Sequence, residues 1–165
     1  MKEQNLETVL KEIEQKGKTL CYTKGVSMLP MLKEGRDISV LIKPDENLLP
    51  GDIVLFVRPE NNGELVLHRI VKAISEHKYL IRGDNTFWDE PVRRENIKAQ
   101  LDGFFRKGKY IDCKTSKGYK LYTFYQLHLY FLRRFFCYTM RIAGAKVKNN
   151  VFHLNNFHLD DYLRK

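Results

Sequence analysis

The spacing of apolar residues divides the chain into a helical start, a central region of strand type and a second helical region. Residues 3–16 place their apolar side chains on one face of a helix, and Gly17 is a natural stop. From residue 19 the period becomes two, which is typical of strands because successive side chains point to opposite faces. We predict strands over residues 19–23, 36–43, 53–58, 64–74, 78–82 and 97–107.

Turn-forming residues separate these predicted strands. They form three clusters: Pro50-Gly51-Asp52, Asn61-Asn62-Gly63 and Gly83-Asp84-Asn85. Short strands joined by such turns, with helices only at the ends, are typical of a coiled antiparallel β-barrel or a folded sheet. We therefore predict a mostly β fold, divided into an N-terminal helix (1–18), a β-rich domain (19–112), a C-terminal helix (118–145) and a tail (146–165).

Composition adds an uneven charge to this picture. The chain of 165 residues has a net charge of +9, yet residues 1–102 carry 16 Lys/Arg against 17 Asp/Glu. The excess lies in residues 103–165, with 13 Lys/Arg against 3 Asp/Glu, where it is interleaved with aromatic side chains. A basic aromatic segment favours an acidic partner such as anionic lipid, nucleic acid or an acidic peptide.

The cysteines and the N-terminus bear on location. Cys21, Cys113 and Cys137 are odd in number, lack metal-ligand spacing and suit a reducing compartment. The first eighteen residues are too charged for a signal peptide, and no apolar run reaches the length of a spanning helix. We expect a cytoplasmic protein that touches a membrane surface at most, and no metal or other cofactor.

Ser27 and His68 are the candidate reactive pair. Ser27 follows Gly25-Val26 and precedes Met28-Leu29-Pro30, just ahead of a predicted strand. A serine hydroxyl is a weak nucleophile until a base takes its proton. His68 lies in an apolar strand, 64-ELVLHRIVKAI-74, where a neutral imidazole is favoured and can act as that base.

A third group is needed to orient the imidazole. Asp84 and Asp89 both follow the turn in 83-GDNTFWDEP-91, and either carboxylate can accept a hydrogen bond from the far ring nitrogen. Taken separately, a turn serine, a strand histidine and a β-turn aspartate are each more often structural than catalytic. Their order along the chain carries the argument.

The blocks GVSMLP, GDIV, LHRI and GDNTFWD occur in that order over residues 20–105. Together they resemble the type I signal peptidases and the related repressor-type self-cleaving serine proteases. Most bacterial members have lysine where this chain has His68. The block is therefore similar to the endoplasmic-reticulum and sporulation subgroup, which uses a Ser-His pair with an aspartate. No anchor or DNA-binding domain is recognisable, so we expect a stand-alone protease domain.

The resemblance implies a role for each residue of the site. Ser27 would be the nucleophile, with its N–H in the oxyanion hole, and His68 the base. Asp89 is favoured as the imidazole partner, with Asp84 shaping the site. Gly25, Met28 and Pro30 would contact the substrate.

The resemblance also implies a coiled antiparallel β-structure and cleavage without metal or cofactor. The substrate would bind as an extended strand against a sheet edge, with small residues before the cut. We predict a serine endopeptidase that removes a leader or signal-like segment from a peptide or protein precursor. The alternative is an inactive peptide- or membrane-docking module of the same fold.

The basic aromatic segment, residues 119–148, has three interpretations. It can lie on an anionic membrane, dock a hydrophobic leader peptide, or pack on the barrel as an ordinary helix. Nucleic acid is the least favoured partner, because no nucleic-acid motif accompanies the charge.

Overall fold

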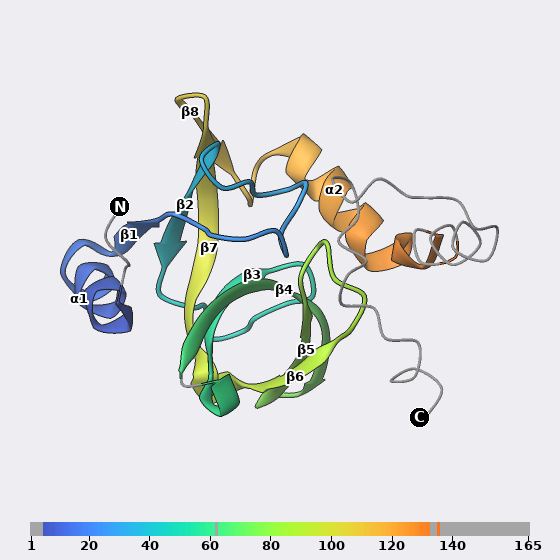
Figure 1. The fold of residues 1–165 in the computed structure, drawn as a ribbon, viewed down its shortest axis with the longest axis horizontal. Helices are drawn as coiled ribbons and strands as arrows, with labels where there is room; N and C mark the ends of the chain where they lie inside the picture. The colour runs from blue at the N-terminus through green and yellow to red at the C-terminus, as the bar shows by residue number, and fades with distance from the viewer. Residues whose placement is uncertain (1–4, 62, 133–134, 136–165) are drawn as a thin grey trace.

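The computed structural model describes residues 5–61, 63–132 and 135, and consists mostly of antiparallel β-structure (Figure 1). Two helices flank the strands. In chain order the elements are α1 (Leu6–Lys16), β1 (Lys18–Cys21), β2 (Asp37–Ile42), β3 (Ile53–Arg58), η1 (Pro59–Asn61), β4 (Glu64–Ser75), β5 (Lys78–Arg82), β6 (Glu90–Arg93), η2 (Arg94–Asn96), β7 (Ile97–Arg106), β8 (Lys109–Asp112) and α2 (Lys117–His128).

The predicted N-terminal helix is confirmed as α1. Asn5 caps its start, accepting a hydrogen bond from the N–H of Glu7 at 2.9 Å, and Gly17 ends it with a φ of 75°. Val9 and Ile13 are buried and attach the helix to the sheet, because both lie on its apolar face.

The predicted mostly β, antiparallel fold is confirmed, and of the two predicted forms the sheet is folded and not closed into a barrel. Its strands follow the order β1-β2-β7-β3-β4-β5-β6, with β8 on β7, and the two end strands do not pair with each other among the described residues. In Figure 1, β3 to β6 curl strongly without completing a hydrogen-bonded ring. The two end strands, β1 and β6, have only four residues each, so each offers few backbone groups for a closing pair.

The six predicted strands are all present within one or two residues of the predicted ends. Sequence reasoning missed two strands, β6 and β8. Both are only four residues long, β6 contains Pro91, and β8 directly follows the turn that ends the long strand β7. Pro91 is tolerated because β6 is an edge strand, paired only with β5.

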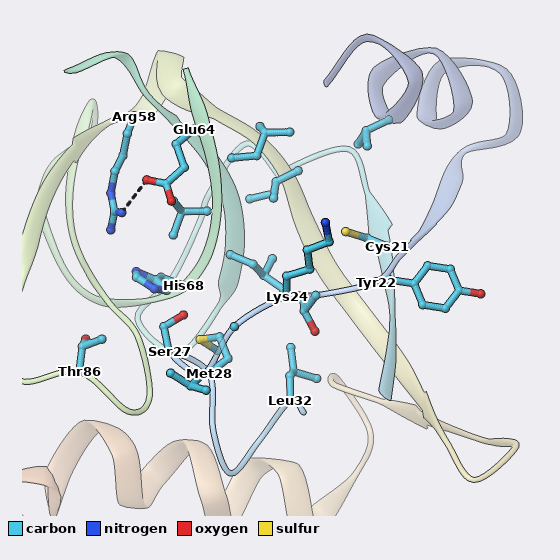
Figure 2. A pocket seen from close by; sticks show the side chains of 18 of the residues that line it. Cys21, Tyr22, Lys24, Ser27, Met28, Leu32, Arg58, Glu64, His68 and Thr86 are labelled. Atoms are coloured by element: carbon cyan, nitrogen blue, oxygen red, sulfur yellow. Dashed lines mark hydrogen bonds and ion pairs between the residues drawn. The ribbon is translucent and has the colours of Figure 1, made fainter. Parts of the chain in front are cut away.

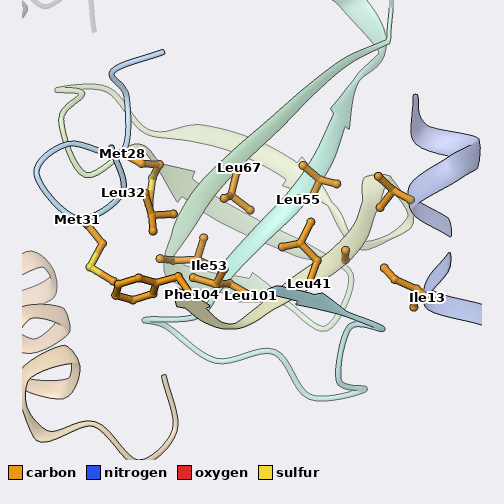
Figure 3. Close-up of a cluster of buried hydrophobic side chains, with 12 residues drawn as sticks. Ile13, Met28, Met31, Leu32, Leu41, Ile53, Leu55, Leu67, Leu101 and Phe104 are labelled. Carbon is orange, nitrogen blue, oxygen red and sulfur yellow. The ribbon is translucent and has the colours of Figure 1, made fainter. Parts of the chain in front are cut away.

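Two apolar clusters hold the strands together. One fills the curl of β3 to β6 and includes Phe56 and Ile81. The other lies between α1, the sheet and the loop after β1 (Figure 3). Met28 and Leu32 extend from that loop into this second cluster, with exposed fractions of 5% and 1%. The loop that carries Ser27 is therefore anchored by burial next to the serine itself.

The predicted C-terminal helix is observed as α2, and residues 130–132 and 135 are helical as well. Ser116 caps its start, accepting from the N–H of Tyr119 at 3.3 Å. The rest of the predicted helix and the tail 146–165 lie outside the described residues. Within the part of the chain that the structure describes, no helix has the length and apolar character needed to cross a bilayer.

Candidate active site

A cleft of about 890 Å³ separates the segment after β1 from the first half of β4 (Figure 2). Ser27 lies on one wall and His68 on the other, so the structure brings the two predicted residues into one cavity. The rest of the lining is mainly apolar. It includes Leu6, Val9, Met28, Leu32, Leu55, Leu65, Val66, Leu67 and Trp88.

Ser27 begins the turn that connects β1 to β2, and the block after β5 holds it in place. The N–H of Asn85 donates to the carbonyl oxygen of Ser27 at 2.7 Å, and the Asn85 side chain donates to the carbonyl oxygen of Val26 at 3.2 Å. The turn Gly83-Asp84-Asn85 therefore clamps the backbone on both sides of the serine.

His68 is buried on β4 with 3% of its surface exposed. Its Nδ1 atom lies 2.8 Å from Oε1 of Glu90, at the start of β6. Its Nε2 atom is buried and has no hydrogen-bond partner among the described residues. Thr23 Oγ1 and Ser39 Oγ share this property, but Nε2 is the atom of the three on a titratable ring that lines the cleft with Ser27. In Figure 2 the Ser27 side chain lies beside the imidazole, with its hydroxyl oxygen toward the ring.

Gly83 allows the two walls to approach each other. A Cβ atom built on Gly83 would lie 2.7 Å from the carbonyl oxygen of Ser27 and 2.9 Å from Nε2 of His68. Both distances are too short for a real side chain, and the first contact is with backbone. The glycine is therefore required by the close approach of Ser27 and His68 at this point.

Glu90 is held by more than His68. Arg58 on β3 donates to both of its oxygens, from Nε to Oε2 and from Nη2 to Oε1, each at 2.7 Å. Burial opposes ionisation of Glu90 and is the largest influence, but the hydrogen bonds from His68 and Arg58 outweigh it and lower its pKa to about 2. Glu90 therefore stays charged at any ordinary pH. Its hydrogen bonds to Arg58 and His68 connect β6 to β3 and β4 through side chains.

The carboxylate beside His68 is Glu90, and neither predicted aspartate occupies that place. Asp89 forms an exposed ion pair with Arg82 at 3.0 Å. Adjacent side chains in an extended chain point to opposite sides. Because the Glu90 side chain points to His68, the Asp89 side chain points away from it. The expectation that Asp89 contacts the imidazole is corrected on this geometry.

Asp84 belongs to a separate, buried ion pair. Both of its oxygens accept from Arg69, at 2.7 and 2.8 Å, and both residues are at most 2% exposed. Arg69 also donates from Nη1 to the carbonyl oxygen of Gly51 at 2.8 Å and to the hydroxyl of Thr123 at 3.0 Å. Asp84 thus affects the site indirectly. Its ion pair with Arg69 holds the turn in which Asn85 donates hydrogen bonds to the backbone at Ser27 and Val26.

The three predicted substrate contacts differ in position. Gly25 and Met28 line the cleft. Gly25 has a φ of 83° and open space around it, so its backbone conformation explains the residue better than close approach does. Pro30 is exposed and lies outside the cleft lining. Its carbonyl oxygen accepts from Arg36 at 2.9 Å, which braces the serine loop.

Glu90 and Arg58 are the site residues that sequence reasoning missed. The signal was weak, because Glu90 directly follows the candidate acid Asp89 in a segment with no clear strand pattern. Arg58 ends a strand, where a charged residue is ordinary. Among the described residues no cluster of His, Cys, Asp and Glu has an arrangement that could hold a metal ion.

The arrangement supports one kind of proton transfer. A neutral imidazole with Nδ1–H donated to Glu90 has its lone pair on Nε2, the ring nitrogen that approaches Gly83 beside the Ser27 backbone. Comparison of the chain with protein-family models, with curated proteins and with solved structures finds no match. A functional assignment therefore depends on the sequence motifs and on the geometry of this cleft.

Proposed function

We propose that the protein is a serine endopeptidase with Ser27 as nucleophile, His68 as general base and Glu90 as the orienting carboxylate. The observation that carries the proposal is the buried Nε2 of His68, which has no hydrogen-bond partner among the described residues and faces the cleft beside Ser27. A histidine kept only for stability would be expected to use both ring nitrogens.

The proposed reaction follows the usual two steps of acyl transfer. His68 Nε2 takes the Ser27 hydroxyl proton as Oγ attacks the peptide carbonyl, and the imidazolium then gives that proton to the leaving amine. Water, deprotonated by the same nitrogen, hydrolyses the acyl-enzyme and restores the serine. Glu90 carries its negative charge throughout, so it stabilises the imidazolium in each step.

The cleft favours an extended peptide as substrate. Residues 64–68 of β4 pair with β3 on one side, whereas β5 pairs with β4 only from Arg69 onward. The other edge of that half-strand therefore borders the cleft, opposite residues 21–27. A peptide strand can pair along such an edge. The apolar lining suits a leader or signal-like segment. The free thiols of Cys21 and Cys113 suit a protein that works in the reducing cytoplasm.

The deciding experiment is cleavage of a diverse synthetic peptide library, read by mass spectrometry. Wild-type protein should cut a consistent set of bonds, and Ser27→Ala should lose that activity by at least about a thousandfold. Ser75→Ala is the matched control, because Ser75 lies at the far end of the same strand, β4, and does not line the cleft.

Equal cleavage by wild type and Ser27→Ala would overturn the proposal. Saturable peptide binding without any turnover by the wild type would instead favour the docking module of the same fold.

A further inference from the structure

Helix α2 turns several hydroxyl and amide side chains toward the domain and several large apolar side chains toward solvent, which differs from an ordinary surface helix. The inward side chains form hydrogen bonds: Thr123 and Tyr119 accept from Arg69 at 3.0 and 3.3 Å. Gln126 is 3% exposed and donates to the hydroxyl of Tyr122 at 2.6 Å. These hydrogen bonds add to the packing of the Tyr119 and Tyr122 rings against the apolar core.

The outward face holds large apolar side chains at helical spacing. Leu121 is 70% exposed, and Phe124 and Tyr125 are exposed beside it, three and four residues further on. Just beyond α2, Phe131, Leu132 and Phe135 are exposed too. Isolated exposed apolar residues are normal, but a row along one helix marks a surface that has a partner. Figure 1 shows α2 at the outside of the molecule, where nothing described covers it.

Charge indicates the kind of partner. Residues 113–159 contain eight Lys/Arg and no Asp or Glu. Within the described part, Lys117 and Lys120 are exposed in the first turn of α2, and Lys114 is exposed just before it, where it pairs with Asp45 at 3.4 Å. A second copy of this chain would bring equal positive charges together across a twofold interface, which opposes self-association.

We propose that the outward face of α2 binds the surface of an anionic lipid bilayer, with Leu121 and Phe124 inserted among the lipids. Aromatic and leucine side chains on one face, flanked by lysine, are the pattern of a helix that lies in the membrane interface. The lysines would contact lipid phosphates, which strengthens binding in proportion to the negative surface charge. The proposal does not depend on catalysis.

The position of α2 would also place the cleft next to the membrane. Tyr130, just after α2, donates a hydrogen bond to the carbonyl oxygen of Thr86, and Thr86 lines the cleft. Arg82 donates to the carbonyl oxygen of Gln126 at 3.3 Å. This second contact connects α2 to β5, the strand just before the Gly83-Asp84-Asn85 turn. A docked protein would hold its cleft close to lipid-bound peptides.

The test is co-sedimentation of the full-length protein with phosphatidylcholine vesicles, prepared with and without phosphatidylglycerol. Wild type should bind the anionic vesicles and lose binding as salt rises. The double variant Leu121→Ser/Phe124→Ser should bind about tenfold more weakly or worse, because it removes buried apolar area. The matched control is Leu20→Ser/Ile74→Ser, two exposed apolar residues on β1 and at the far end of β4, which should bind like wild type.

Three results would overturn the proposal. The first is no binding of wild type to anionic vesicles, which would leave an acidic protein as the better partner. The second is equal binding by the α2 double variant, which would assign membrane binding to basic charge alone. The third is a wild-type dimer in lipid-free solution that the α2 variant dissociates. Thermal unfolding followed by circular dichroism should show both double variants folded.

Discussion

Neighbouring residues of β4 carry two basic groups that face opposite sides of the strand and behave differently. Arg69 donates to five oxygen atoms, two of them on Asp84, and lies in the interior under α2. His68 uses one nitrogen for Glu90 and leaves the other in the cleft without a partner among the described residues. Both carry a carboxylate partner, so pairing alone does not distinguish a structural group from a reactive one.

The difference lies in whether the hydrogen-bonding capacity is used up. A saturated buried ion pair can hold elements together, and Arg69 holds β4, the Gly51 turn, the Asp84 turn and α2. Burial opposes its charge and is the largest single influence, yet Asp84 more than offsets it and raises the pKa of Arg69. An unsaturated buried nitrogen costs stability and is therefore expected where chemistry needs it.

The largest effect on stability should come from breaking the Arg69 pair. Arg69→Leu leaves the Asp84 carboxylate buried without its guanidinium and should lower the free energy of unfolding by about 3–5 kcal/mol. Urea titration measures this. Arg93→Leu is the control, since its pair with Glu95 is exposed and should contribute no more than about 1 kcal/mol. Similar losses from both substitutions would contradict the structural role of Arg69.

The largest effect on activity outside the Ser-His pair should come from Glu90→Gln. A neutral amide cannot stabilise the imidazolium, so kcat for peptide cleavage should fall by about a hundredfold or more. Glu64→Gln is the matched control, because Glu64 also pairs with Arg58, at 3.1 Å, but is not bonded to His68. Equal losses from the two variants would mean that Glu90 acts only through Arg58.

Acid should remove the contribution of Glu90 to stability. The ordinary value for this carboxyl is 4.5 and the folded pKa is about 2, so the stabilisation is complete above pH 4.5 and is lost as the pH falls toward 2. The difference in unfolding free energy between wild type and Glu90→Gln should therefore narrow over this window. Urea titrations at successive pH values measure it, and a constant gap would show that the ionised form is not what stabilises the fold.

The smallest effect should come from Asp89→Asn. Asp89 is exposed and pairs with Arg82, so its loss should change cleavage by less than about threefold and stability by less than about 1 kcal/mol. The same cleavage assay applies. A loss as large as that of Glu90→Gln would restore Asp89 as the imidazole partner and imply that the cleft rearranges when substrate binds.

Local patterns predicted much of the fold. Alternation and turn residues predicted six of the eight described strands, and the apolar stripe with Gly17 predicted α1, because these signals involve residues close together in the chain. They failed for β6, a four-residue edge strand whose proline obscures the alternation. They also failed for the openness of the sheet, which depends on whether two distant short strands meet.

Local sequence pattern is enough to place Ser27 in a turn ahead of a strand and to put His68 and Arg69 on opposite faces of one strand. The identity of the carboxylate at His68, Glu90, follows from the tertiary structure alone. β6 lies two strands from β4 in the sheet order, and the curl of β3 to β6 brings Glu90 back across that distance. Curvature arises from the twist and packing of the whole sheet, and no short stretch of residues encodes it.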